Sequence, residues 1–69
     1  MPMPASDMLC VISDLIDRIN CCKIENEGLD WIIDKMMKEY ERGLYTMAMR
    51  MYGMAYHRFR SLTDDKSNT

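Results

Sequence analysis

Apolar residues recur at helical spacing in two separate stretches of this 69-residue chain. In the first stretch the spacing alternates between four and three residues, which is typical of an amphipathic helix with one apolar face. The stripe consists of Met8, Ile12, Leu15, Ile19 and Cys22, and it is widened by Leu9, Val11 and Ile16. The pattern predicts a helix over about residues 6–22, with Ser6 or Asp7 as its N-cap.

The second apolar series is longer and predicts either one helix over about residues 28–62 or two helices that meet at Gly43. Its members are Ile33, Met37, Tyr40, Leu44, Met47, Met51 and Met54. It is flanked by Leu29, Ile32, Met36, Ala48, Ala55, Phe59 and Leu62. We favour a break at Gly43, because glycine costs about 1 kcal/mol relative to alanine inside a helix. Asn26 is the expected N-cap, and the short connection before it predicts that the first helix packs antiparallel to the second helical segment.

The sequence therefore predicts an all-α protein, either a helical hairpin or a three-helix protein. Residues 1–5 are expected to be a flexible lead-in, residues 6–62 a single helical domain, and residues 63–69 a flexible tail. We also expect a homodimer. The first helix offers one stripe over about 17 residues, whereas the second series extends over about 35 residues and needs more apolar cover than one short helix provides.

The composition excludes several classes of protein. Hydrophobic residues make up 48% of the chain and charged residues 29%, which predicts a folded domain rather than a disordered one. The early apolar run from Met8 to Ile12 is far shorter than the roughly 20 residues that a membrane span needs. The N-terminal residues also lack the pattern of a secretory signal. These features predict a cytoplasmic protein without a membrane partner.

The cysteines and the single histidine do not indicate a metal site or an active site. Cys10, Cys21 and Cys22 lack the spacing of a disulfide framework or a zinc site, so we expect three reduced thiols, buried or half-buried. His57 has no partner at a spacing that would orient it as a general base. We therefore predict a protein that is not an enzyme and that uses no cofactor and no metal.

Charge is distributed unevenly along the chain, although the net charge is only −2. Residues 1–34 contain seven acidic and two basic residues, whereas residues 35–69 contain four acidic and seven basic residues. One interpretation is that the acidic and basic halves pack against each other, within one chain or across a dimer. The other is that the basic half forms a docking face.

The last predicted helix carries the candidate partner-binding surface. Methionine side chains adapt to many partner shapes, and aromatic and arginine residues commonly anchor protein interfaces. The candidate residues are Met47, Arg50, Met51, Tyr52, Met54, Arg58 and Phe59. The competing interpretation is that this stripe is core or dimer interface, in which case it is hidden from other proteins.

Two other functions are consistent with the same helix. Arg50, Arg58 and Arg60 alternate with aromatic residues, and such a set can hold phosphates while the rings stack on bases. Nucleic acid is not the favoured partner, because three arginines are a small footprint in an acidic chain. A third possibility is a chaperone-like hairpin that covers a hydrophobic helix of a client protein.

Residues 41–55 resemble a family of small enterobacterial virulence regulators, the PerC-like activators and AraC-negative regulators. The pattern E-x-G-L/D-Y-x-x-A-x-x-W-x-x-A is matched by Glu41, Gly43, Tyr45, Ala48, Tyr52 and Ala55, with Tyr52 in place of tryptophan. Residues 56–63 are similar to the final helix of Hha-type nucleoid modulators. Both resemblances imply a small helical protein that modulates transcription by binding another protein. The favoured partner is thus a transcriptional regulator in a bacterial or phage setting.

Overall fold

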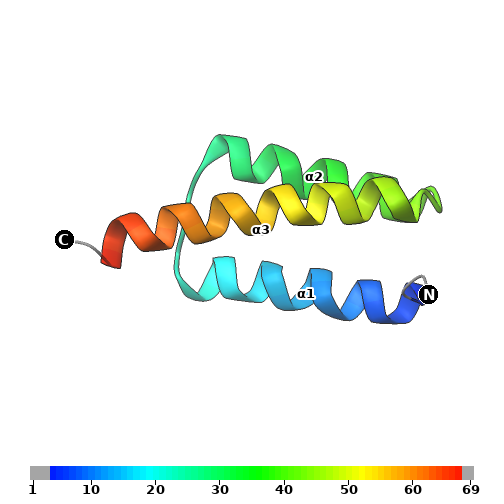
Figure 1. The fold of residues 1–69 in the computed structure, drawn as a ribbon, viewed down its shortest axis with the longest axis horizontal. Coiled ribbons are helices and arrows are strands. Elements are labelled where there is room, and N and C mark those ends of the chain that lie inside the picture. The colour runs from blue at the N-terminus through cyan, green and yellow to red at the C-terminus, as the bar shows by residue number, and fades with distance from the viewer. Residues whose placement is uncertain (1–3, 68–69) are drawn as a thin grey trace.

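The chain folds into three α-helices in the computed structural model, which describes residues 4–67 (Figure 1). The helices are α1 (Ala5–Cys21), α2 (Glu27–Glu41) and α3 (Tyr45–Ser67). α1 and α3 run in the same direction along the long axis, and α2 runs opposite to both (Figure 1). The all-α class and the three-helix alternative are confirmed, as is the predicted break at Gly43.

α1 begins one residue earlier than predicted, because Pro4 rather than Ser6 or Asp7 is its N-cap. Pro4 has the extended backbone usual for an N-cap (φ −60°, ψ 151°), and its carbonyl accepts the first helical hydrogen bonds, from the amides of Asp7 and Met8. Ser6 and Asp7 therefore lie inside the first turn, where the acidic side chain of Asp7 is favoured by the helix dipole. Most of the predicted lead-in, residues 1–3, lies outside the described residues.

Both turns between helices end in a residue with a left-handed backbone. Gly43 has φ of 80°, and the amide of Leu44 donates a 2.9 Å hydrogen bond to the carbonyl of Glu39. After α1, Lys23 has φ of 54°, and the amide of Ile24 donates a 3.2 Å hydrogen bond to the carbonyl of Ile19 in the last turn of α1. This arrangement satisfies carbonyls that would otherwise lack a partner, and it reverses the chain direction at each helix end.

The start of α2 agrees with the sequence prediction. The side-chain Oδ1 of Asn26 accepts a 2.9 Å hydrogen bond from the amide of Leu29, as expected of an N-cap. Leu29 is fully buried, so this cap also fixes where the chain enters the core.

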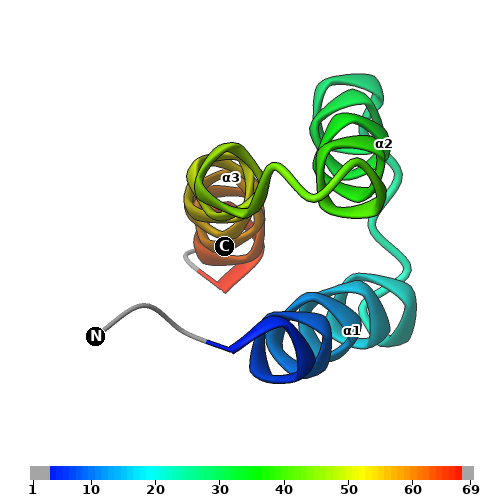
Figure 2. The same ribbon diagram turned by 90° about the vertical axis from the view of Figure 1, so that its right-hand side faces the viewer.

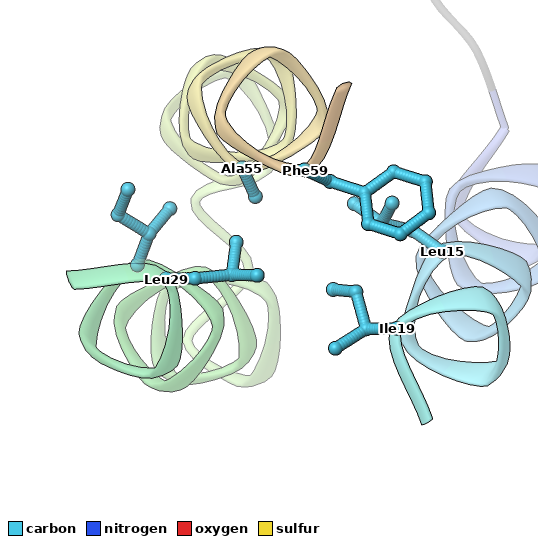
Figure 3. Packing of buried hydrophobic residues seen from close by; sticks show 6 residues of the cluster. Leu15, Ile19, Leu29, Ala55 and Phe59 are labelled. Atoms are coloured by element: carbon cyan, nitrogen blue, oxygen red, sulfur yellow. The ribbon is translucent and has the colours of Figure 1, made fainter. Parts of the chain in front are cut away.

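The core is built from one face of each helix (Figures 2 and 3). Its apolar members are Met8, Ile12, Leu15, Ile19, Leu29, Ile32, Met36, Ala48, Ala55 and Phe59. Figure 3 shows Phe59 reaching from α3 toward Leu15 of α1, while Ala55 faces Leu29 of α2. α3 packs most extensively on α2 and less on α1. Small alanine side chains allow the α2 and α3 backbones to approach closely, which accounts for this difference.

The second apolar series lies mostly outside the core, in contrast to the alternative interpretation of its methionine stripe as core. Leu44, Met47 and Met54 are exposed, and the remaining members are only partly buried. Most of the residues that were expected to flank the series line the core instead. The cause is the turn at Gly43, which gives α2 and α3 separate axes, so that one heptad pattern does not describe both helices. Cys22, assigned to the first stripe, is also exposed because it follows the end of α1.

α3 extends beyond the predicted end at residue 62 and reaches Ser67. The hydroxyl of Thr63 donates to the carbonyls of Phe59, at 3.1 Å, and Arg60, at 2.9 Å. This bonding within the helix accommodates a polar side chain at a helical position. The last part of the predicted tail, residues 68–69, lies outside the described residues.

Candidate protein-binding face

The structure divides the seven predicted partner-binding residues between the core and the surface of α3. Phe59 is only 6% exposed and belongs to the core, so its assignment as a contact residue is corrected. Met51 and Tyr52 are half-buried and pack against the core cluster. The exposed members are Met47, Arg50, Met54 and Arg58.

Met47 and Met54 give α3 a second apolar stripe. They are seven residues apart, so they lie on the same side of the helix. Their side chains are 44% and 52% exposed. Ala48 and Ala55, one position further along, are fully buried against the other helices. α3 is thus apolar toward the core and also along a neighbouring strip of its surface.

The exposed stripe lies beside α2 and away from α1. Arg58, four residues after Met54, holds its guanidinium against Gly28 of α2, so close that a Cβ at Gly28 would be 3.1 Å from Nη1. Tyr52 lies on the other side of α3, toward α1, where the charges of Asp14 and Arg18 are close enough to act on the pKa of its hydroxyl. The Met47–Met54 stripe therefore borders the side of the α2–α3 pair that α1 leaves uncovered.

α2 contributes charged residues to this side. Glu39 is 5% exposed, and its Oε1 lies 3.8 Å from Nζ of Lys35 and 3.6 Å from Nη1 of Arg42. Gly28, Lys35, Glu39 and Arg42 follow helical spacing, so they form one strip of α2 that faces the same way. We call the surface formed by Lys35 and Arg42 of α2 together with Met47, Arg50, Met54 and Arg58 of α3 the outer face.

Sequence reasoning missed the contribution of α2 to the outer face. Lys35 and Arg42 were not among the candidate residues, because they precede the last helix in the sequence. A signal was nevertheless present: the chain from Arg42 to Thr63 contains four arginines and no acidic residue. Such a run is unusual in a protein with net charge −2, and it indicates a basic surface.

Arg60 does not belong with Arg50 and Arg58, although all three were predicted as one nucleic-acid set. Arg58 and Arg60 are two residues apart, so their side chains leave the helix on nearly opposite sides. The pKa of the Arg60 guanidinium is raised, first by a side-chain hydrogen bond with Tyr56 and then by the charges of Tyr56 and Asp64. Arg60 is therefore engaged locally, away from the outer face.

Two tyrosines fill the opposite side of α3, toward α1. The rings of Tyr52 and Tyr56 stack with centroids 6.1 Å apart. Burial raises the pKa of the Tyr52 hydroxyl above its ordinary value of 10.0, and the nearby charges of Tyr56 and Asp14 raise it further. This side of α3 is thus a packing surface, and Tyr52 is better placed to stabilise the fold than to contact a partner.

The described residues contain no cluster of side chains with the composition of a metal site. No three histidine, cysteine, aspartate or glutamate side chains there are close enough to hold a metal ion. All three cysteines are free and exposed, which corrects the expectation that they are buried or half-buried. His57 borders a surface hollow lined by α3 alone, through Tyr56, His57, Arg60, Ser61 and Asp64.

Comparison of the chain with protein-family models, curated proteins and solved structures gives no match. Within residues 4–67, no helix is both long enough and apolar enough to cross a lipid bilayer. The outer face is consequently interpreted from its own geometry and chemistry.

Proposed function

We propose that this is a small non-enzymatic protein that binds and modulates another protein through its outer face. The observation that carries the proposal is the exposure of Met47 and Met54 on one side of α3, beside the exposed Arg50 and Arg58. Fully burying an exposed methionine is worth about 1.5–3 kcal/mol, and because Met47 and Met54 are already about half buried, covering each contributes roughly half of that. Methionine is flexible, so it fits a partner surface with little strain.

The partner class that we propose is a transcriptional regulator in the cytoplasm of a bacterium or a phage-infected cell. This part of the proposal comes from the resemblance of residues 41–55 to PerC-like and AraC-negative regulators. In this chain, several of the matching positions build the α2–α3 connection: Gly43 forms the turn, and Ala48 and Ala55 allow the close contact of the helices. The resemblance is therefore consistent with a helical scaffold that this chain shares with those regulators, while the exposed residues differ.

The proposal is tested by site-specific photo-crosslinking in the native host. A photoreactive amino acid at position 54 is expected to capture a distinct protein, identified by mass spectrometry. The matched control carries the same group at position 17, where Asp17 is exposed on α1. Adding Met47→Glu to the position-54 variant should abolish capture, because a charge would then replace part of the apolar stripe. Equal capture from both positions, or capture from neither, would refute the proposal.

Direct binding of nucleic acid is the second candidate. The observation in its favour is that Lys35, Arg42, Arg50 and Arg58 share the outer face, whereas Arg60 lies elsewhere. Two of these cations are already paired with Glu39, which reduces the charge available to phosphates. A gel shift with duplex DNA at about 0.15 M salt, where the screening length is about 8 Å, is expected to show no binding below micromolar concentration. Tight binding that Arg58→Ala weakens would favour this second function.

A further inference from the structure

The outer face is basic, and part of its charge lacks an intramolecular partner. It has four cationic side chains, while Glu39, the carboxylate between Lys35 and Arg42, is almost completely buried. Among the described residues, Arg50 and Arg58 form no ion pair, unlike the pairs made by Arg18 and Lys38 with carboxylates on their own helices. Two guanidinium groups thus remain available to carboxylates of another molecule.

Arg58 packs at the beginning of α2, in whose first turn the acidic residues Glu27 and Asp30 partly offset the positive charge of the helix end. Its guanidinium lies against Gly28, in the first turn of α2. The N-terminal end of a helix carries partial positive charge, which stabilises anions and not cations. An acidic group that approaches this point would interact favourably with the guanidinium of Arg58, which forms no ion pair with the carboxylates of that turn.

The apolar part of the outer face has the spacing that a helix recognises. Met47 and Met54 are one heptad apart, and Met51, which packs on the core and borders the outer face, divides that interval into steps of four and three residues. This is the alternation along which the side chains of a neighbouring helix interdigitate. α1 covers one side of the α2–α3 pair (Figure 2), so a further helix on the outer face would cover the other side and complete a four-helix arrangement.

We propose that the outer face binds an amphipathic α-helix of a partner protein, with an apolar stripe flanked by aspartate and glutamate. This inference rests on the proposed function and adds the chemistry of its partner. The apolar stripe of the ligand helix packs on Met47 and Met54, and its acidic flanks pair with Arg50 and Arg58. A second copy of this chain is a poorer ligand. Its acidic helix, α1, already buries Ile12 and Leu15 in its own core.

Two synthetic peptides test the proposed ligand chemistry. Both have leucine at every a and d position of a heptad repeat. One has glutamate at the e and g positions and the other has lysine, so like charges keep each peptide from pairing with itself. Calorimetry at low salt should show that the glutamate peptide binds about tenfold more tightly than the lysine peptide. NMR shift mapping should place its contacts at Lys35, Met47, Met54 and Arg58.

Charge-reversal variants provide the matched controls. The double variant Arg50→Glu/Arg58→Glu is expected to invert the preference in favour of the lysine peptide. Arg60→Glu, on the far side of α3, should leave the preference unchanged. Circular dichroism melting checks that each variant is folded. If the reversed charges destabilise the helix, the neutral variant Arg50→Gln/Arg58→Gln replaces the charge-reversal variant. With the glutamine variant, the preference should disappear instead of inverting.

Several results would overturn the inference. One is that neither peptide binds, or that both bind with equal affinity. Another is that the NMR shift changes are confined to α1. A third is that duplex DNA competes with the glutamate peptide for the same residues. Self-association through the outer face, lost on Met54→Glu, would also overturn it by making a second copy the occupant. The peptide experiment and the crosslinking experiment can fail independently of each other. If position 54 captures a protein but the glutamate peptide does not bind, only the partner chemistry is wrong.

Discussion

The hydroxyl of Tyr40 donates a 2.9 Å hydrogen bond to the backbone carbonyl of Ala5, joining the last turn of α2 to the first turn of α1. The two residues are 35 positions apart in the sequence. Because α1 packs less extensively on the other helices than they do on each other, this bond is expected to matter for holding the N-terminal end of α1 in place.

Replacing Tyr40 with phenylalanine removes that bond and keeps the ring. We expect Tyr40→Phe to lower the free energy of unfolding by about 1 kcal/mol, the usual net value of one hydrogen bond. Amide hydrogen exchange should accelerate first at the beginning of α1. The control is Tyr45→Phe, because the Tyr45 ring lies 5.4 Å from the Tyr40 ring while its hydroxyl has no hydrogen bond within the described part of the chain. Equal losses in the two variants would contradict the role of the bond.

Two left-handed turn residues should respond to substitution with opposite signs. Lys23 carries a side chain at φ 54°, so Lys23→Gly is expected to raise the free energy of unfolding by up to about 1 kcal/mol. Gly43 has φ of 80°, so Gly43→Ala is expected to lower it by about 1–2 kcal/mol. Urea denaturation measures both.

Gly53→Ala provides the control for the glycine substitutions. Gly53 lies inside α3, and a Cβ there would meet no atom within 4 Å. Alanine should therefore stabilise the protein by about 1 kcal/mol through helix propensity alone. If Gly43→Ala stabilised the protein as Gly53→Ala does, the left-handed turn between α2 and α3 would not exist in solution.

Charged substitutions should distinguish the outer face from the core. Met54→Glu places a carboxylate four residues from both Arg50 and Arg58, so the melting temperature should hardly change while partner capture is lost. Met51→Glu should instead lower the free energy of unfolding by about 1–3 kcal/mol, since Met51 packs against the core cluster. Thermal melts followed by circular dichroism make the comparison. A large loss in Met54→Glu would mean that this residue is structural.

Stability should fall in alkaline solution, in part because of Tyr52. Its pKa is raised above 10.0 in the folded protein, chiefly by burial, so the folded state disfavours the phenolate. The contribution is fully present below pH 10 and is lost as the pH rises above that value, because the unfolded chain ionises first. Tyr52→Phe should make the decline between about pH 9.5 and pH 11 shallower than in Tyr45→Phe. Identical slopes in the two variants would contradict this assignment.

The homodimer stays a prediction, and the structure changes its basis. With a break at Gly43, α3 folds back on α2, and the two helices bury most of the residues that flank the apolar series, whereas Leu44, Met47 and Met54 stay exposed. Light scattering after size-exclusion chromatography at micromolar concentration decides the question. A stable monomer of about 8.2 kDa would exclude the dimer, whereas a dimer that Met54→Glu dissociates would place its interface on the outer face.

Local signals in the sequence predicted the helices well. The alternating stripe of α1, the capping role of Asn26 and the break at Gly43 each depend on a few neighbouring residues. Pro4 was missed as the N-cap because it caps with its backbone, and side-chain chemistry pointed to Ser6 and Asp7 instead. Such local features are set by backbone geometry within about one helical turn.

The orientation of the helices was the part that the sequence did not reveal. Ala48 and Ala55 are small, so they contribute little to a hydrophobic pattern, yet their size is what lets α3 approach α2. Glu39 is charged, yet it is buried beside Lys35 and Arg42. Both facts depend on contacts between α2 and α3. Of the candidate residues on α3, Phe59 proved to be core, and the binding role of the exposed ones stays a prediction.

The unequal exposure of the methionines has a chemical consequence. Met36 is fully buried and Met8 is 6% exposed, whereas Met47 and Met54 are about half exposed. A mild oxidant such as dilute peroxide reaches the exposed thioethers first and converts them to sulfoxides, which are polar. The core sulfurs are shielded meanwhile. Oxidation would therefore alter the outer face, through which we propose that the protein binds its partner, before it altered the fold, and methionine sulfoxide reductases reverse this change.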